Sequence, residues 1–394
     1  DVLESIPNIL ARLGAQRPLI VTDRGVSDAG LVDVLTAAIG PRITIGGIED
    51  SVPVDSSIKT VADLAVTYRR QACDALIAVG GGSVLDTAKG INILVSEDND
   101  DLKAFSGSGT VKRPLRPLLA VPTTSGTGSE TTLVAVIKDE KRHRKMAYAS
   151  PFLIPDAAVL DSRMTLTLPP VITAATGMDA LTHAVEAYTC LAKNPLSDVG
   201  ALRAIKLISR YLPQVMDAPE NKEGRLALAL AATLAGMAFG NSMVGMVHNI
   251  GHALGGVCGV PHGQCMAMLL PYGLEYNLHK NGHLTAEILA YLADEEIYAR
   301  TPREARADAV IQLIREFNEN LHQACHGGHP RFLSEVRNSQ GEAVVSADAL
   351  PRVVRAALDD AAILFNPEDL DCEDYLMVLE HAWDGRSLDR SRVR

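Results

Sequence analysis

The stretch Gly177-Met178-Asp179-Ala180-Leu181-Thr182-His183-Ala184-Val185-Glu186 organises our interpretation of the whole chain. It contains no proline, is rich in helix formers, and follows a break at Leu168-Pro169-Pro170, so we predict a buried helix. Asp179 and His183 are four residues apart and would lie one above the other on one helix face. A carboxylate and an imidazole so placed can hold one divalent cation.

Three further histidines strengthen the case for a metal. His248 and His252 repeat the four-residue spacing, and His262 follows in the turn Val260-Pro261-His262-Gly263. Unpaired buried imidazoles are costly, and one oxygen ligand with several imidazoles suits Fe(II), Zn(II), Co(II) or Ni(II). On spacing alone a surface ion pair explains Asp179 and His183 equally well, and both explanations stay open at this point.

The first half of the chain alternates between short apolar runs and helix-like segments. This alternation predicts an α/β domain with a doubly wound, Rossmann-like parallel sheet, whose ligands bind at the carboxyl ends of the strands. The expected strands are 17–23, 43–45 and 75–80, and the expected helices are 3–14, 31–39 and 58–72. The chain begins at Asp1 and runs straight into helix-like sequence, as expected if an initial strand precedes the numbered segment.

Three predicted strand ends carry groups that suit a dinucleotide. Asp23 can accept hydrogen bonds from a ribose and repel a 2′-phosphate, although an acid there is also a common helix cap. Gly80-Gly81-Gly82-Ser83-Val84-Leu85-Asp86-Thr87-Ala88-Lys89 lets backbone N–H groups approach an anion. Pro122-Thr123-Thr124-Ser125-Gly126-Thr127-Gly128-Ser129-Glu130 offers small donors beside a second phosphate or a nicotinamide amide. Two such loops at neighbouring strand ends favour a nucleotide site.

The remaining segments suggest a change of architecture near residue 170. We expect a hairpin from 131–138 and 144–149, a last strand at 155–161, and a boundary at Pro169-Pro170. The domains would be residues 1–170, α/β and dinucleotide-binding, and residues 171–394, all-α with the metal and substrate sites. The expected helical stretches are 173–191, 197–211, 223–254 and 263–278, with 326–346 as an exposed insertion that leaves His326 and His329 in solvent.

Composition narrows the classes of function. The 394 residues suffice for two domains, and 47% hydrophobic with 22% charged residues is typical of a globular protein. A net charge of −11 argues against a nucleic-acid partner, and the basic run Lys141-Arg142-His143-Arg144-Lys145 is expected to be a solvated turn, except for Lys145. Six cysteines without CxxC spacing and no apolar leader or spanning run predict a cytoplasmic protein with no membrane partner.

With these motifs in order, the chain resembles the iron-containing (group III) alcohol dehydrogenases over nearly its whole length. The motifs that carry the resemblance are VTD at 21–23, GGGSVLDTAK at 80–89, PTTSGTGSE at 122–130, KMAYASP at 145–151, AATGMDALTHAVE at 174–186, HNIGHALGG at 248–256, VPHG at 260–263 and NPEDL at 366–370. The resemblance implies the dehydroquinate synthase-like architecture, an α/β domain followed by a helical one.

The resemblance also implies roles for individual residues. The metal ligands would be Asp179, His183, His248 and His262, with Fe(II) as the expected ion and Zn(II) as a possible one. His252 matches a histidine near the nicotinamide, and we expect it to relay a proton. Cofactor contacts would fall on Asp23, Asp55, Gly81, Gly82, Ser83, Asp86, Thr123, Thr124, Thr132 and Lys145. Asp55 departs from the usual Asn at its position and slightly weakens the NAD assignment.

The expected reaction is hydride transfer between NAD(H) and a small primary alcohol or aldehyde by a homodimer or larger homo-oligomer. A dehydroquinate synthase-like cyclase or lyase would also fit, as would a polyol or maleylacetate-type dehydrogenase of the same superfamily. Outside the enzymes, a metal- and nucleotide-binding sensor without turnover would fit as well. The complete set of four candidate ligands favours the iron-type dehydrogenase.

Overall fold

The computed structural model describes residues 2–141 and 144–393, and the chain divides into two compact units, Asp1–Leu168 and Pro169–Arg394. The basic run at 141–145 includes residues 142 and 143, which lie outside the described residues, so its prediction as a solvated turn stays a prediction.

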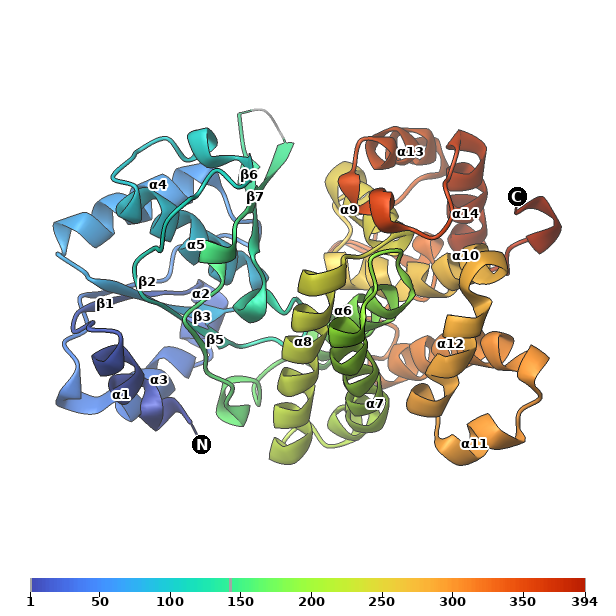
Figure 1. Cartoon of the computed structure of the whole chain (residues 1–394), viewed down its shortest axis with the longest axis horizontal. Coiled ribbons are helices and arrows are strands. Elements are labelled where there is room, and N and C mark those ends of the chain that lie inside the picture. Colours follow the sequence, from blue (N-terminus) through green and yellow to red (C-terminus); the bar gives the residue numbers. More distant parts are fainter. Residues whose placement is uncertain (1, 142–143, 394) are drawn as a thin grey trace. The chain divides into compact units, whose positions relative to one another are not determined.

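The first unit contains a parallel sheet with the strand order β2-β1-β3-β5-β8. Its strands are β1 (Pro18–Val21), β2 (Gly47–Glu49), β3 (Ala75–Gly80), β5 (Leu118–Pro122) and β8 (Ala157–Ala158). Its helices are α1 (Ile6–Arg12), α2 (Arg24–Asp28), α3 (Leu31–Ile39), α4 (Ile58–Arg70) and α5 (Gly82–Ser96). This arrangement confirms the predicted doubly wound sheet (Figure 1).

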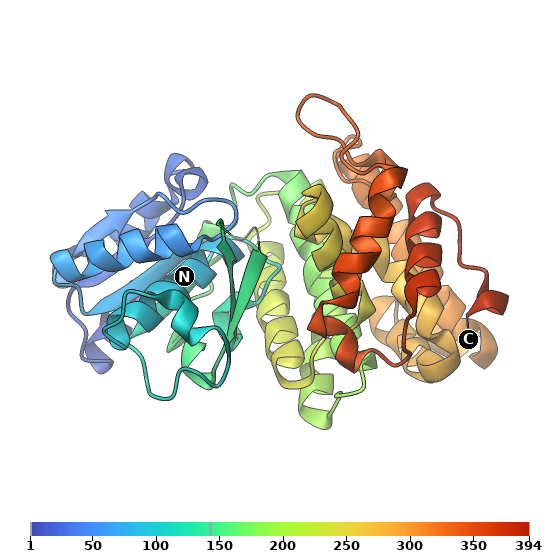
Figure 2. The same cartoon turned by 90° about the horizontal axis from the view of Figure 1, so that it is seen from above.

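Alternating side chains of the strands belong to two separate cores, one on each face of the sheet. Leu19 and Leu76 pack with residues of α4 and α5, whereas Ile20 and Ile77 pack with residues of α1 and α3. Because successive strand residues point to opposite faces, fully apolar strands are what a sheet covered on both sides requires. The two helix layers can be followed in Figure 1 and Figure 2.

The strand order also explains why the predicted cofactor loops are neighbours. β1 lies between β2 and β3, and β3 pairs with β5 in a register that places Gly80 beside Pro122. The chain leaves β1 toward one edge of the sheet and continues from β3 toward the other, so the β1/β3 junction is a topological switch point. Asp23, the Gly-rich loop and Thr123 therefore follow the carboxyl ends of three adjacent strands.

Two strands differ from their predicted positions. The expected strand at 43–45 is wrong, because the strand in this region is β2, which pairs with β1 as Leu19 with Gly47. A Cβ at Gly46 would lie 2.4 Å from Sγ of Cys73, so the residue just before this edge strand fits beside Cys73 as glycine. The β-branched residues at 43–45 precede the strand and are not part of it. The last strand is only Ala157–Ala158, shorter than the predicted 155–161.

A smaller sheet with the order β4-β7-β6 also belongs to the first unit. Its strands are β4 (Gly107–Ser108), β6 (Val134–Asp139) and β7 (Arg144–Ala149). β6 and β7 pair antiparallel, which confirms the predicted hairpin.

The second unit is helical, as predicted, and surrounds one large apolar core. Its helices are α6 (Pro170–Thr189), α7 (Pro195–Asp217), α8 (Lys222–Ser242), α9 (Met246–Cys258), α10 (His262–Leu292), α11 (Glu295–Arg300), α12 (Arg306–Ala324), α13 (Leu350–Leu358) and α14 (Cys372–Asp384). From Gly177 to Thr189 every residue of α6 is buried, which confirms the buried helix predicted around Asp179 and His183.

The predicted continuous helical stretch at 223–254 is wrong, because the chain bends by 105° between α8 and α9. Met243 has a positive φ of 106°, a conformation that is rare for a residue with a side chain, and Gly245 begins the new helix. A Cβ at Gly245 would lie 2.8 Å from Oδ1 of Asn366 and 3.2 Å from Oε1 of Glu186. The break is therefore made by tertiary contacts, which local periodicity does not reveal.

The segment 326–346 is only in part the exposed insertion that its composition suggested, because residues 326–328 and 337–343 are exposed whereas residues 329–336 are buried or half-buried. His329 and Leu333 are fully buried, and Val345 is nearly so. His322 Nδ1 lies 2.8 Å from the carbonyl oxygen of His329, and this contact ties the segment to α12. Of the two histidines predicted to lie in solvent, His326 alone is exposed.

The helices of the described residues are too short or too polar to span a bilayer singly. The pair α8 and α9 reaches the required length and composition only together, and the two are bent sharply against each other.

Candidate functional site

Four candidate ligands meet inside the second unit. Asp179 and His183 lie one turn apart on α6, His248 lies on α9, and His262 is the first residue of α10. One ligand atom from each residue lies within 4.8 Å of those of all the others. The structure therefore brings together the four residues that the sequence nominated as metal ligands.

Three polar atoms of this cluster lack hydrogen-bond partners within the protein. Oδ1 of Asp179 lies 3.7 Å from Nδ1 of His183 and 3.3 Å from Nε2 of His262, without hydrogen-bond geometry. Oδ1 of Asp179, Nδ1 of His183 and Nε2 of His248 are buried and accept or donate no hydrogen bond. Buried polar atoms are normally satisfied, because leaving them unpaired costs about 1 kcal/mol or more. A divalent cation among them would satisfy all of these atoms, so the donor set fits a metal.

Burial keeps the imidazoles in the form that binds metals. It lowers the pKa of His183 to about 3 and holds the pKa of His248 well below its usual range. Burial acts to raise the pKa of Asp179, but the neighbouring histidines outweigh it and hold that pKa below its usual range. His183 and His248 thus present neutral imidazoles beside the carboxylate of Asp179, and three imidazoles with one carboxylate form a borderline donor set for Fe(II) or Zn(II).

Close helix packing beside the cluster depends on glycine at residue 263. A Cβ at Gly263 would lie 2.4 Å from the backbone oxygen of Ala175, which cannot move aside as a flexible side chain can. This glycine lets α10 begin against α6, and Nε2 of His262 thereby lies 3.3 Å from Oδ1 of Asp179.

Glu186 contacts His248 at Nδ1, the ring nitrogen opposite the unpartnered Nε2. The sequence did not reveal this contact. Oε2 of Glu186 lies 2.5 Å from Nδ1 of His248, and its Oε1 accepts a hydrogen bond from the backbone N–H of Val247 at 2.7 Å. Burial raises the pKa of Glu186 to about 7, against the opposing effect of hydrogen bonds from backbone N–H groups. The available signal was its place three residues after His183, on the same face of α6.

His252 lies beside the cluster but outside it. Its ring centroid is 5.4 Å from that of His262 and 5.9 Å from that of His248, and its side chain is 44% exposed. Nδ1 of His252 lies 2.9 Å from Oδ2 of Asp360. Burial acts to raise the pKa of Asp360, but the contact with His252 outweighs it and lowers that pKa. The sequence did not nominate Asp360, because it lies 108 residues away from His252.

Asp23, Gly81 and Gly82, three of the predicted cofactor residues, follow the ends of β1 and β3. Asp23 caps α2 by accepting a hydrogen bond from the N–H of Val26, so its cap role is real, with one carboxylate oxygen engaged. Gly81 precedes α5 as its N-cap, and Gly82 is the first residue of that helix. A Cβ at Gly82 would lie 2.9 Å from Cγ2 of Thr127, so the second loop packs directly on the Gly-rich loop.

Thr123 and Thr124 continue β5 at the same edge of the sheet. The N–H of Thr123 donates to the carbonyl of Gly80 at 3.1 Å, and a Cβ at Gly81 would lie 3.3 Å from the Thr124 side chain. The two loops therefore form one continuous surface in the first unit.

Asp86 and Thr132 are engaged inside the protein. The carboxylate of Asp86 accepts hydrogen bonds from Oγ of Ser129 and from the N–H of Val136, both at 2.9 Å. Nζ of Lys89 donates to Oγ of Ser129 and to both oxygens of Thr132. Burial lowers the pKa of Lys89 to about 8, and burial also raises that of Asp86. This network fixes the loop after β5 to α5.

Asp55 and Lys145 are paired with each other on the surface of the first unit. Nζ of Lys145 lies 3.3 Å from Oδ1 of Asp55, and Nζ of Lys138 lies 3.9 Å from its Oδ2. Oγ of Ser83 donates to the carbonyl of Val54, next to Asp55. These three predicted cofactor residues thus gather around one turn.

Comparison with known proteins covers both units. Residues 1–162 match the family model described as iron-containing alcohol dehydrogenase, and residues 173–383 match that of the Fe-containing alcohol dehydrogenase family, C-terminal. An NAD-dependent methanol dehydrogenase of Bacillus methanolicus is 33% identical over 95% of this chain and 94% of its own length. A 1,3-propanediol dehydrogenase of Klebsiella pneumoniae is 35% identical over 94% and 92%, respectively.

Solved structures agree with these matches. The crystal structure of a 1,3-propanediol oxidoreductase is 32% identical, covers 97% of this chain and 96% of its own, and superposes with a TM-score of 0.90.

Proposed function

The chain belongs to the iron-containing alcohol dehydrogenase family, and from this we infer an NAD-dependent alcohol dehydrogenase that interconverts a small alcohol and its aldehyde. The cluster of Asp179, His183, His248 and His262 is the observation that carries this function. The relatives are named as dehydrogenases, which favours an enzyme over a metal- and nucleotide-binding sensor without turnover.

We propose these four residues as the ligands of Fe(II), with Zn(II) as a second ion that suits the same donors. When bound, the ion supplies Lewis acidity that lowers the pKa of an alcohol hydroxyl and favours hydride transfer to NAD. The chain supplies the alignment. Asp179 contributes the single negative charge among the ligands, so a bound divalent ion keeps net positive charge toward an alcohol oxygen.

For the first unit we propose a dinucleotide-binding role at the β1/β3 switch point. Gly81, Gly82 and Ser83 begin α5, where free backbone N–H groups suit a pyrophosphate. The carboxylate of Asp23 favours NAD over NADP through repulsion of a 2′-phosphate. The remaining proposed contacts are Asp55, Asp86, Thr123, Thr124, Thr132 and Lys145, of which Asp86 and Thr132 act by fixing the loop.

We propose that His252 relays the proton between the substrate site and solvent. Its ring is exposed, lies next to two ligand rings, and is oriented by Asp360 through a 2.9 Å contact. Histidine is the side chain that most often serves as a general acid or base in proteins. His252→Ala with full metal content should lower kcat and change its pH profile. Wild-type kinetics in that variant would contradict the relay.

The substrate class that we propose is a small primary alcohol or aldehyde, since the relatives are named for methanol and 1,3-propanediol. The match to this family does not favour a dehydroquinate synthase-like cyclase or lyase, nor a polyol or maleylacetate-type dehydrogenase. We also propose a cytoplasmic homodimer or larger homo-oligomer. All six cysteines are unpaired, which suits a reducing compartment.

One experiment tests the reaction and the metal together. Metal-stripped protein is reconstituted without oxygen with Fe(II), with Zn(II) or with buffer alone, and NADH is monitored with a panel of short alcohols and aldehydes. We expect turnover that Fe(II) restores and buffer does not. Tight metal binding without any change in NADH would support the cyclase or the sensor instead.

A further inference from the structure

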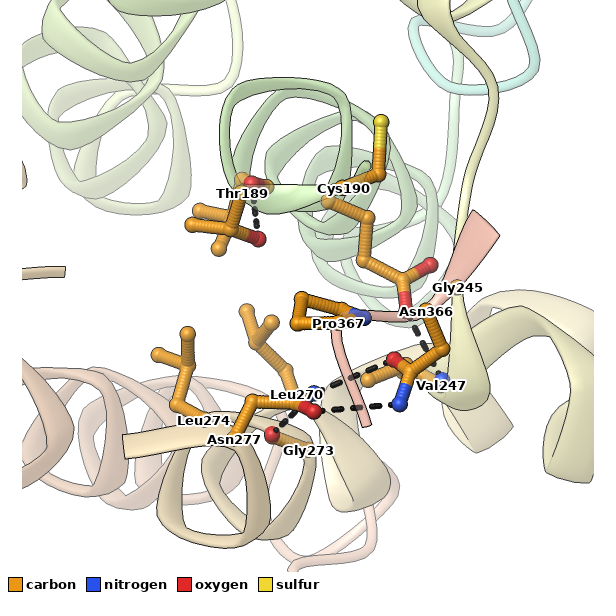
Figure 3. Close-up of a pocket in the computed structure, with 12 residues that line it drawn as sticks. Thr189, Cys190, Gly245, Val247, Leu270, Gly273, Leu274, Asn277, Asn366 and Pro367 are labelled. Carbon is orange, nitrogen blue, oxygen red and sulfur yellow. Dashed lines mark hydrogen bonds between the residues drawn. The ribbon is translucent and has the colours of Figure 1, made fainter. Parts of the chain in front are cut away.

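The start of α9 is held by residues from other parts of the second unit. Oδ1 of Asn366 accepts the N–H of Met246 at 3.1 Å, and Glu186 accepts that of Val247 at 2.7 Å. Figure 3 shows Asn366 facing Asn277, with which it exchanges two hydrogen bonds, beside Gly245 and Val247. Gly245 makes no side-chain cap, so these distant groups replace the local cap that a helix usually has.

Glu186 differs from Asn366 because it also reaches a candidate ligand. It lies on α6 on the face that carries Asp179 and His183, and its Oε2 lies 2.5 Å from Nδ1 of His248. The backbone groups of Gly245, Val247 and His248 that face Glu186 are all N–H donors. Oε1 accepts from the N–H of Val247 and Oε2 from the N–H of His248, so both oxygens act as acceptors, and we assign Nδ1 of His248 as the donor to Oε2.

We propose that Glu186 is a positioning residue that fixes the tautomer of His248. A neutral imidazole has one protonated nitrogen, so a proton held on Nδ1 leaves the lone pair on Nε2. Nε2 is the buried, unpartnered atom of the cluster. The Glu186 carboxylate thus caps the start of α9 and also orients His248. It thereby sets which nitrogen of His248 can bind a metal. This proposal rests on the metal-binding function proposed above.

The matched pair of variants is Glu186→Gln and Asn366→Ala. Glu186 accepts on both oxygens, from the N–H of Val247 on Oε1 and from Nδ1 of His248 on Oε2. An amide has an oxygen on one side only, so its NH₂ group would oppose one of these donors. We expect Glu186→Gln to bind Co(II) about 10- to 100-fold more weakly, the usual cost of losing an orienting partner of a ligand. Asn366→Ala loses a cap of the same helix but leaves the contact between Glu186 and His248 intact.

Metal-free proteins would be titrated with Co(II) in competition with a chromophoric chelator, and the visible spectrum of bound Co(II) and the thermal midpoint recorded. We expect a weaker, altered Co(II) spectrum in Glu186→Gln, and a lower thermal midpoint with a wild-type spectrum in Asn366→Ala. Wild-type affinity in Glu186→Gln would overturn the proposal. Equal losses of affinity in both variants would overturn it too, because helix capping alone would then account for them.

A measurement on the wild-type protein covers the case in which Glu186→Gln fails to fold. With ¹⁵N-labelled histidine, the ring nitrogen shifts of His248, assigned through His248→Asn, report the tautomer directly. We expect the proton on Nδ1, and a proton on Nε2 would overturn the proposal. If wild-type protein binds no Co(II) and produces no NADH, the proposed function fails, and that outcome is distinct from wild-type binding retained in Glu186→Gln.

Discussion

Asp179, His183 and His248 present buried polar atoms that nothing in the second unit satisfies, whereas Lys89 and Asp86 of the first unit have partners on every side. The helical unit thus holds unpartnered potential ligand atoms together at one buried site. In the sheet unit Lys89 and Asp86 are engaged internally, and the glycine backbone and hydroxyl groups of the two loops are left for the proposed ligand, together with the carboxylate of Asp23. A metal site is therefore encoded in side-chain chemistry, and a dinucleotide site mainly in backbone shape.

The largest effect should come from removing the negative charge of Asp179 from the cluster of candidate ligands. Asp179→Asn keeps the size of the side chain but removes its negative charge, and metal content should fall. Since a Lewis-acid metal supplies several kcal/mol, we expect kcat/KM to fall roughly a thousandfold. Metal analysis and NADH-monitored turnover would measure the two losses, while NAD affinity should not change.

Asp308→Asn provides the matched control, because Asp308 pairs with Arg390 on the surface of the same unit. Full metal content and turnover in Asp179→Asn would show that Asp179 is not a ligand. The contrast between the two units would then be wrong.

A smaller effect is expected from breaking the internal network of the first unit. Lys89 is fully buried, and Lys89→Met would leave Asp86 without its cation. Breaking a buried charged pair costs about 3 kcal/mol, so the free energy of unfolding should fall by that amount. NAD affinity should weaken as the loop at Ser129 loosens, with no change in metal content. Urea unfolding and NAD titration would measure these, with exposed Lys112→Met as the control.

The same variant carries a pH signature. The pKa of Lys89 is about 8 in the folded protein and about 10.4 in an unfolded chain, so between these values the unfolded state binds more protons. Stability of the wild type should therefore rise with pH in this window relative to Lys89→Met. A difference between the two proteins that does not depend on pH would contradict the buried, charged state of Lys89.

The smallest effect concerns cofactor choice. Asp23→Asn and Asp23→Ala both remove the charge that repels a 2′-phosphate, but only Asn keeps an oxygen for the N–H of Val26. One charge at close range in water is worth about 1 kcal/mol, so the ratio of kcat/KM with NADP to that with NAD should rise roughly fivefold in both. Only Asp23→Ala should lose about 1 kcal/mol of stability through the cap. An unchanged ratio would leave Asp23 as a cap alone.

How far the sequence could predict the molecule follows from the same contrast. The spacing of Asp179 and His183 and the alternation of apolar runs are local, so this pair and the doubly wound sheet were predictable from the residues. His248 and His262 joined the predicted ligand set only through the family resemblance. The bend at Met243 was not, because Glu186 and Asn366 make it from distant parts of the chain.

Other failures have the same physical cause. His329 is buried although its neighbours are polar and glycine-rich, because the packing of a whole unit decides its environment. The strand near residue 47 follows its pairing with β1, which overrides the local preference of 43–45. The partner of His252 is Asp360, and no pattern in the sequence relates two residues so far apart.

His262 is the side of the cluster that is open to solvent. Its side chain is 40% exposed, whereas those of Asp179, His183 and His248 are at most 7% exposed. An ion can therefore leave by release of one ligand at the first turn of α10, with the other three still in place. For the proposed ion, exchange would then be a local event at His262, and chelators, competing ions and dissolved oxygen would meet this ligand first. The ion found in a purified sample would then depend on the metals to which the folded protein was exposed.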